Sequence, residues 1–173
     1  LKFPNKVKVK IIQPKLLNNF LSSTITSKKI IADPRTLPAN IYMFLKTVKT
    51  IIKLINDPIE ILKSQKNNTE INGMRAAHLR DGIALTKSIF WIKEKVFKNQ
   101  LNELQAIKKI DGNRSKNKYF HSLSFPTIAG SGPNGAIVHY HANKKSNRRI
   151  KDTDLFLIDS GGQYLDGTTD VTR

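Results

Sequence analysis

The stretch that most constrains this chain is residues 155–173, which carries two aspartates on a predicted hairpin. An apolar strand ends in Asp159, a glycine-containing loop follows, and a β-branched return strand contains Asp170. If the hairpin folds about the middle of its loop, the two carboxylates lie opposite each other, with Cβ atoms roughly 5 Å apart. Such a pair repels unless it shares a proton or binds a cation, which predicts two buried acids that hold a hard divalent metal. In the alternative, Asp159 begins a plain turn and Asp170 faces water.

The charge of the chain first suggests a polyanion partner, since 30 Lys and Arg against 13 Asp and Glu give a formal net charge of +17. The basic residues are spread from Lys2 to Lys151 and accompany abundant Ile and Asn, so we attribute the excess to an AT-rich coding sequence. Cysteine is absent, and no apolar run approaches the roughly 20 residues of a membrane span. We expect a soluble, cytoplasmic protein with no membrane partner, and nucleic-acid binding is the lesser alternative.

Residues 1–65 alternate strand and helix patterns, which predicts an α/β layer. The predicted strands cover residues 6–12, 28–33 and 50–55. The predicted helices cover residues 15–21, 37–48 and 57–65. The last of these helices has a strong start, because Asp57 can cap it, Pro58 suits its first position and Glu60 lies where a capping box needs an acid. We place a domain boundary after it, which gives two domains, residues 1–65 and 66–173.

Two longer helices are predicted in the second domain. The first runs from about Thr69 to Lys98 and has one largely apolar side. That side carries Ile71, Met74, His78, Leu85, Ile89, Ile92 and Val96. His78 is a lone helical histidine, for which packing or capping is a better explanation than catalysis. The second helix follows Asn102, which can cap it together with Gln105.

A further hairpin is predicted from strands at residues 123–128 and 136–141, joined by a turn-rich loop over residues 129–135. By the period of two, His139 and His141 lie on the same face of the second strand. The loop is not a phosphate-binding fingerprint, because no helix follows to present its N-terminus. We interpret it as a connector or as the wall of a site.

Six segments of the chain together resemble the aminopeptidase P branch of the creatinase, or pita-bread, metallopeptidase family. In order, they are residues 31–36, 57–59, 73–82, 124–128, 132–140 and 158–173, the last reading I-D-S-G-G-Q-Y-L-D-G-T-T-D-V-T-R. One departure is Gly162, where the family commonly has alanine. The resemblance implies a mixed α/β (α+β) fold: residues 1–65 would be the C-terminal part of a creatinase-like second domain, and residues 66–173 the first half of a pita-bread catalytic domain.

The same resemblance implies an activity and a set of site residues. The family removes an N-terminal residue that precedes proline, using a hydroxide that bridges two metal ions. By position, Asp159 would chelate one metal ion, Asp170 would bridge both, and His139 would be a catalytic residue that donates a hydrogen bond near the tetrahedral intermediate. Mn²⁺ is the implied metal, and Zn²⁺ or Co²⁺ would also suit the ligands. We assign no role to His141.

The resemblance also implies ligands that this sequence lacks. The family takes one histidine and two glutamates from later segments, whereas the glutamates here lie on predicted helices before the hairpins. They are Glu60, Glu70, Glu94 and Glu103. Two aspartates alone should bind metal weakly. We therefore expect a truncated piece of a longer enzyme, which begins with Leu1 instead of methionine and does not retain its metal without a second fragment.

The sequence alone leaves several functions open. The leading hypothesis is an Xaa-Pro metallo-aminopeptidase acting on proline-containing peptides, here as an incomplete or inactive fragment whose partner would be the missing half. The alternatives are a non-catalytic basic binding module, a peptide-binding module without catalysis, and a functionless gene remnant. A steep salt dependence of binding would favour the basic module. A homodimer is compatible with the pattern, which does not define the oligomeric state.

Overall fold

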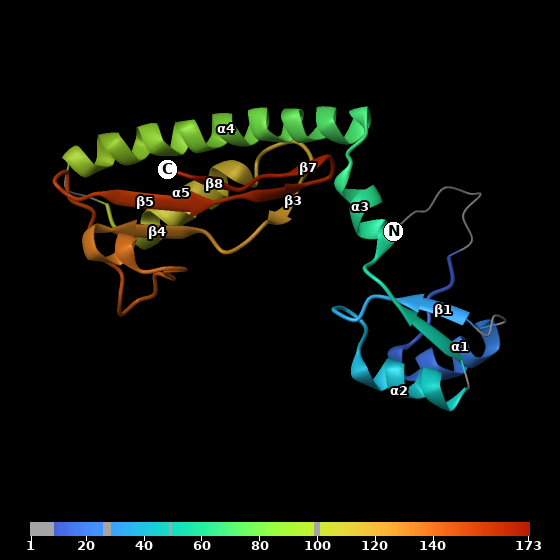
Figure 1. Ribbon diagram of the computed structural model, residues 1–173. Helices are drawn as coiled ribbons and strands as arrows, with labels where there is room; N and C mark the ends of the chain where they lie inside the picture. The colour runs from blue at the N-terminus through green and yellow to red at the C-terminus, as the bar shows by residue number, and fades with distance from the viewer. Residues whose placement is uncertain (1–8, 26–28, 49, 99–100) are drawn as a thin grey trace. The chain divides into compact units, whose positions relative to one another are not determined.

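The computed structural model describes residues 9–25, 29–48, 50–98 and 101–173 (Figure 1). Contacts within the chain divide it into two compact units, Leu1–Gln65 and Lys66–Arg173. Each unit combines helices with strands, so the mixed α/β class predicted from the sequence is confirmed. Within those four ranges, no helix has both the length and the apolar composition needed to cross a membrane.

The first unit contains a parallel strand–helix–strand arrangement. Its elements are, in order, η1 (Pro14–Leu16), α1 (Leu17–Thr24), β1 (Lys29–Ala32), α2 (Ala39–Thr47), β2 (Ile51–Leu54) and α3 (Pro58–Ser64). β1 and β2 pair in parallel, with Lys29 opposite Ile51, and α2 connects them. The strands and helices predicted between residues 15 and 65 are confirmed, apart from Lys28, which lies outside the described residues.

The strand predicted over residues 6–12 is wrong in its described part. Residues 6–8 lie outside the described ranges, and residues 9–12 form no strand. Val9 and Ile11 are 48% and 88% exposed. Alternating apolar residues form a strand only where a neighbouring strand satisfies the backbone, and among the described residues the β1–β2 sheet has two strands.

The capping box predicted at the start of α3 does not form. Asp57 caps the helix as predicted, accepting a hydrogen bond from the Ile59 N–H at 2.9 Å. The Asp57 N–H, however, donates to Asp33 at 2.8 Å, and Glu60 accepts from Arg35 Nη2 at 2.7 Å. The hydrogen bonds from Arg35 hold the pKa of Asp33 well below its ordinary value. Arg35 therefore ties the end of β1 to the start of α3.

Among its described residues, the second unit contains two α-helices, a short 3₁₀ helix and two antiparallel three-stranded sheets. α4 (Asn68–Phe97) and α5 (Glu103–Arg114) begin in capping boxes that are formed by Asn67 with Glu70 and by Asn102 with Gln105. One sheet contains β3 (Phe120–Leu123), β6 (Gly162–Tyr164) and β7 (Gly167–Thr168), and the other contains β4 (Ile128–Ser131), β5 (Phe156–Ser160) and β8 (Val171–Thr172). α4 runs along the length of the strands (Figure 1). Both predicted helices are confirmed.

The hairpin predicted from residues 123–128 and 136–141 is wrong. β3 pairs with β6 and β4 pairs with β5, while the chain after β4 enters a 3₁₀ turn, η2 (Gly132–Ala136), and residues 137–141 form no strand. The chain turns back closely here, since a Cβ on Gly130 would lie 2.8 Å from the Asn134 carbonyl group. Pairing with the distant β5 therefore replaces the local hairpin.

The core of the second unit is a cluster of buried apolar side chains contributed by both helices and by the strand and loop residues that follow them. It contains Leu85, Ile92, Leu101, Ala106, Ile110, Ile150 and Ile158. On the side of α4 predicted to be apolar, Leu85 and Ile92 are buried, but Met74 and His78 are exposed. The buried side of α4 instead includes the charged residue Asp81.

Asp81 is buried because it pairs with Arg114 of α5, and both residues are 0% exposed. Arg114 Nη2 donates to Asp81 Oδ2 at 2.8 Å, and the Tyr164 hydroxyl donates to Oδ1 at 2.7 Å. Burial by itself would raise the pKa of Asp81, but the hydrogen bonds from Arg114 and Tyr164 outweigh it and hold this pKa below its ordinary value. Arg114 Nη2 also lies 3.4 Å from the Ser160 carbonyl oxygen. The pair therefore joins α4, α5 and the end of β5.

We expect Arg114→Met to lower the free energy of unfolding by about 3–5 kcal/mol, because it leaves the Asp81 carboxylate buried without its cation. Urea denaturation followed by circular dichroism measures the change. The matched control is Lys108→Met on the exposed side of α5, for which we expect a change within about 0.5 kcal/mol. If the two variants lose the same stability, the ion pair does not organise this unit.

Candidate functional site

Asp159 lies on β5, the central strand of the β4–β5–β8 sheet. Its neighbour Ile158 faces the core, so the side chain of Asp159 faces the opposite side of the sheet. Asp159 is opposite Thr172 of β8, and not opposite Asp170 as predicted. The loop between the two aspartates is not a simple turn, because it contains β6 and β7, which belong to the other sheet. Asp170 is two residues from Thr172 and stays on the face of Asp159 as a diagonal neighbour.

A pocket of about 290 Å³ brings the predicted site residues together. Its lining residues are Phe125, Pro126, Ile128, His139, His141, Asp159 and Asp170. The two aspartates come from β5 and from the segment before β8, and the two histidines come from the loop that follows η2. Segments that lie far apart in the sequence therefore place two carboxylates and two imidazoles around one cavity.

The two aspartates are open to solvent, so the prediction that both are buried is wrong. Asp159 is half-buried and Asp170 is exposed. The Thr172 hydroxyl donates a hydrogen bond to Asp159 Oδ1 at 3.0 Å, which restrains one carboxylate oxygen and leaves the other without this contact. Both carboxylates are therefore accessible to an ion or a substrate.

His139 lies in a tight turn, so the strand predicted for it is wrong. The Tyr140 N–H donates to the Ile137 carbonyl at 3.2 Å, and His139 has a φ of 54°. His139 is the third residue of this four-residue turn, the position at which a type II turn requires a positive φ. The turn still places His139 and His141 in the same pocket. Such strained residues cluster at functional sites, which makes His139 a candidate on structural grounds as well.

A close crossing of the chain beside Gly161 fixes the backbone before Asp170. A Cβ on Gly161 would overlap the carbonyl oxygen of Thr169. Thr169 is buried, its N–H donates to the Gly162 carbonyl at 2.9 Å, and its hydroxyl accepts from the Gly162 N–H at 2.9 Å. The Ser124 hydroxyl donates to the Thr169 carbonyl at 2.9 Å. Because Thr169 is bonded on several sides, the position of Asp170 depends on this crossing.

The donor chemistry of the pocket fits part of a metal site. Carboxylate oxygens suit Mn²⁺, and imidazole nitrogens suit Zn²⁺ or Co²⁺. In the part of the chain that the structure describes, no group of three or more His, Cys, Asp and Glu side chains is placed to hold an ion. Asp159 and Asp170 could supply two ligands, which are too few to fix two ions.

Sequence reasoning missed several residues that shape this pocket. Phe125 and Pro126 form part of its wall. The sequence did indicate these two residues, because both lie in the segment 124–128 that resembles the metallopeptidase family. Asp81 also lies in such a segment, 73–82, whereas Arg114 lies in none of them. Their pairing behind the pocket could not be predicted, because a helical charge pattern does not show which charges find a buried partner.

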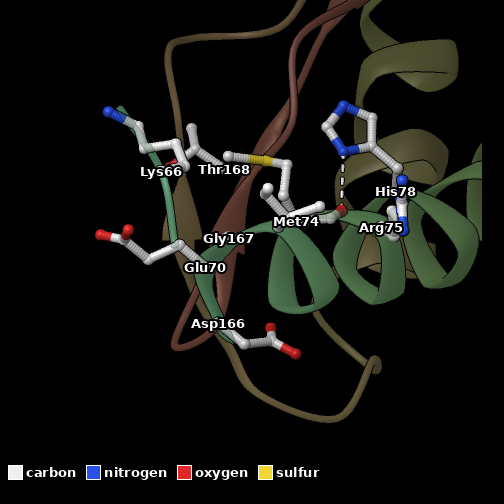
Figure 2. Close-up of a pocket in the computed structure, with 9 residues that line it drawn as sticks. Lys66, Glu70, Met74, Arg75, His78, Asp166, Gly167 and Thr168 are labelled. Carbon is white, nitrogen blue, oxygen red and sulfur yellow. Dashed lines mark hydrogen bonds between the residues drawn. The ribbon is translucent and has the colours of Figure 1, made fainter. Parts of the chain in front are cut away.

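A second pocket, of about 460 Å³, lies where the start of α4 meets the turn between β6 and β7 (Figure 2). It is lined by Lys66, Glu70, Ile71, Met74, Arg75, His78, Asp166, Gly167 and Thr168. His78 Nδ1 lies 2.9 Å from the Met74 carbonyl oxygen of its own helix (Figure 2). Glu70 caps α4, and Asp166 forms an ion pair with Arg80. These groups have structural partners and do not include the predicted site residues, so we place the function in the first pocket.

The fold and the paired aspartates define the class of this protein. The model of "Metallopeptidase family M24" matches residues 72–173, which is more than half of the chain. The chain therefore belongs to metallopeptidase family M24. This finding confirms the relationship predicted from the six sequence segments.

Curated proteins with similar sequences include Xaa-Pro aminopeptidases. Xaa-Pro aminopeptidase ApepP of Drosophila melanogaster is 47% identical over 117 residues, which are 67% of this chain and 19% of the relative. A probable Xaa-Pro aminopeptidase P of Paracoccidioides brasiliensis (strain Pb03) is 49% identical over 124 residues, which are 70% of this chain and 20% of the relative. The chain therefore spans about a fifth of the length of these relatives.

Solved structures show the same fold. The X-prolyl aminopeptidase of Caenorhabditis elegans, described as a cytosolic enzyme with a di-nuclear active site, matches with a TM-score of 0.79 and 32% identity over 92% of this chain and 26% of that chain. The prolidase of Pyrococcus furiosus matches with a TM-score of 0.72 and 26% identity over 95% of this chain and 48% of that chain. The mixed α/β fold thus matches known structures of such peptidases.

We expect Gly161→Ala to lower the free energy of unfolding by about 1–3 kcal/mol, because its Cβ would overlap the Thr169 carbonyl oxygen. The same displacement should shift the backbone NMR signals of Asp170. Gly112→Ala in α5 is the matched control: its Cβ meets nothing within 4 Å, and it should stabilise the helix by about 0.5–1 kcal/mol. An unchanged Asp170 signal in a folded Gly161→Ala variant would contradict the positioning role of the crossing.

Proposed function

We propose that this chain contributes one part of the active site of an Xaa-Pro metallo-aminopeptidase, in which Asp159 and Asp170 are metal ligands and His139 is the catalytic imidazole on the substrate side. The observation that carries the proposal is the pocket in which these three side chains meet. The similarity of the chain to curated Xaa-Pro aminopeptidases supports it. The substrates would be peptides with proline in the second position.

Asp159 and Asp170 would hold the metal, and Mn²⁺ fits their hard oxygen donors, with Zn²⁺ and Co²⁺ as alternatives. The C. elegans relative, described as having a di-nuclear active site, supports a centre of two ions. When bound, the ions would supply Lewis-acid charge for peptide hydrolysis. Two carboxylates leave such a centre incomplete, so the remaining ligands would come from polypeptide beyond these 173 residues, either in the same chain or in a second one.

The residues of this chain would bind and orient the peptide. His139 projects from a tight turn into the pocket, where its ring N–H can donate a hydrogen bond to the oxygen of the scissile carbonyl. Phe125, Pro126 and Ile128 form an apolar wall that can exclude water from one side of the peptide. Thr172 orients the Asp159 carboxylate through its hydroxyl.

The domain assignment is part of the same proposal. Residues 1–65 would be the C-terminal part of a creatinase-like domain, and residues 66–173 the first half of a pita-bread catalytic domain. The parallel β1–β2 pair with its connecting α2, and the separate sheets of the second unit, support this division. A cytoplasmic location would agree with the description of the C. elegans relative as cytosolic.

The test is hydrolysis of a short Xaa-Pro peptide in the presence of Mn²⁺. The chain is assayed alone and together with the part of a similar Xaa-Pro aminopeptidase that follows the matched region. We expect no turnover by the chain alone and Mn²⁺-dependent turnover by the mixture. Asp159→Asn and Asp170→Asn should each reduce the turnover of the mixture at least about 100-fold, and His139→Gln should lower kcat by a similar factor.

The control is Asp152→Asn, an exposed aspartate outside the pocket that undergoes the same chemical change. Turnover that is as fast with Asp159→Asn as with the unsubstituted chain would refute the ligand assignment. Turnover by the chain alone that disappears with Asp159→Asn would support the ligands and show that the remaining ones are already present.

A further inference from the structure

Glu103, the first residue of α5, is a carboxylate that is fully removed from solvent. Its exposed fraction is 0%. A carboxylate is stable in such a place only when hydrogen-bond donors replace the water around both of its oxygens. The residues that supply these donors therefore have their positions set by Glu103.

Donors from four segments converge on this carboxylate. Oε1 accepts hydrogen bonds from the Ser131 N–H at 2.8 Å and from Asn134 Nδ2 at 2.9 Å. Oε2 accepts from the Tyr140 hydroxyl at 2.8 Å and from the Arg148 N–H at 2.9 Å. Glu103 thus ties together the end of β4, the η2 turn, the loop that contains Tyr140 and the return toward β5.

Tyr140 connects this cluster to the candidate site. It is 5% exposed and directly follows His139 in the chain. Its hydroxyl donates to Glu103 and accepts from Asn134 Nδ2 at 2.8 Å, so the ring is held at its far end. Its N–H closes the turn to the Ile137 carbonyl.

His139 itself is held only through its backbone. It is exposed and has a φ of 54°, a backbone conformation that residues other than glycine rarely adopt. Within the described ranges, no hydrogen bond or ion pair to the His139 ring is present. The turn must therefore be kept in shape from outside, and the nearest anchored side chain is that of Tyr140.

We propose that Glu103 is a positioning residue for His139, acting through the hydroxyl of Tyr140 and the turn that this residue closes. The catalytic role of this positioning rests on the function proposed above. The structural link between Glu103 and the turn of His139 does not depend on that function. A glutamine cannot replace Glu103, because each carboxylate oxygen accepts from two donors, and an amide NH₂ at either position would face N–H or O–H groups.

The first test measures amide hydrogen exchange by NMR on the full chain without metal. In Glu103→Gln we expect the Tyr140 N–H to exchange at least tenfold faster than in the unsubstituted chain, because the turn is no longer anchored. The N–H of Ile158, which bonds to the Arg173 carbonyl at 2.8 Å in the β5–β8 pair, should keep its rate. Glu94→Gln, an exposed glutamate of α4, is the matched control and should change neither rate.

A milder variant keeps the proposal testable if Glu103→Gln does not fold. Tyr140→Phe retains the ring and removes the hydroxyl, which lies 2.8 Å from Glu103 Oε2 and also 3.0 Å from the Ser146 carbonyl oxygen. It should speed exchange of the N–H of residue 140 at least threefold and leave the Ile158 rate unchanged. Unchanged exchange at residue 140 in folded Tyr140→Phe, or in folded Glu103→Gln, would overturn the proposal.

The second test follows the His139 ring signal while MnCl₂ is added, with His139→Gln used to assign the signal. Mn²⁺ at Asp159 and Asp170 should broaden the His139 signal in the unsubstituted chain. In Glu103→Gln, or in Tyr140→Phe if Glu103→Gln does not fold, we expect at least twofold less broadening of the His139 signal at equal Mn²⁺ occupancy. If the residue 140 N–H exchanges faster but the His139 signal broadens as much as in the unsubstituted chain, Glu103 stabilises the turn without positioning His139, and the proposal is overturned.

Absence of any His139 broadening in the unsubstituted chain would count against the proposed metal site and not against Glu103. In that case the exchange rate of the residue 140 N–H alone decides the role of Glu103. The two failures are therefore distinguishable.

Discussion

The ion pair between Asp81 and Arg114 is the interaction on which the second unit most depends. Two charges are withdrawn from water there, and Tyr164 and the Ser160 carbonyl add hydrogen bonds that offset part of this cost, while the Nη1 of Arg114 has no partner among the described residues. These four residues belong to α4, α5, β6 and β5. Displacing α4 or α5 would leave a charge unpaired, and displacing β5 or β6 would remove a hydrogen bond from the pair, so the strand that carries Asp159 is held from its buried side.

The opposite face of the same strand carries the pocket, and a second buried carboxylate supports it. Glu103 holds the loop of His139 from within, and Arg114, the partner of Asp81, holds β5 from behind. In both cases a fully buried acid gathers donors from distant segments, and an exposed group at the surface takes its position from that acid. This division between buried anchors and exposed functional groups lets a small unit present Asp159, Asp170 and His139 to solvent in a defined arrangement.

The sequence predicted the features that depend on local signals. The apolar pattern marked the long helix α4, the capping pair Asn102 and Gln105 marked α5, and the string around Asp159 and Asp170 identified the family. It could not predict features that depend on pairing between distant segments. The register of Asp159 opposite Thr172, the turn at His139, and the burial of Asp81 and Glu103 follow from partners far away in the chain.

The central claim is that Asp159 and Asp170 bind a metal ion beside His139. The most direct test is an anomalous difference map at the manganese absorption edge from crystals of this chain in complex with the part of a similar Xaa-Pro aminopeptidase that follows the matched region, soaked in MnCl₂. We predict a peak within about 2.0–2.6 Å of oxygens of both carboxylates, in the pocket that His139 lines. The peak should be absent in the Asp159→Asn, Asp170→Asn double variant. Manganese peaks elsewhere on the chain and none between these aspartates would contradict the account.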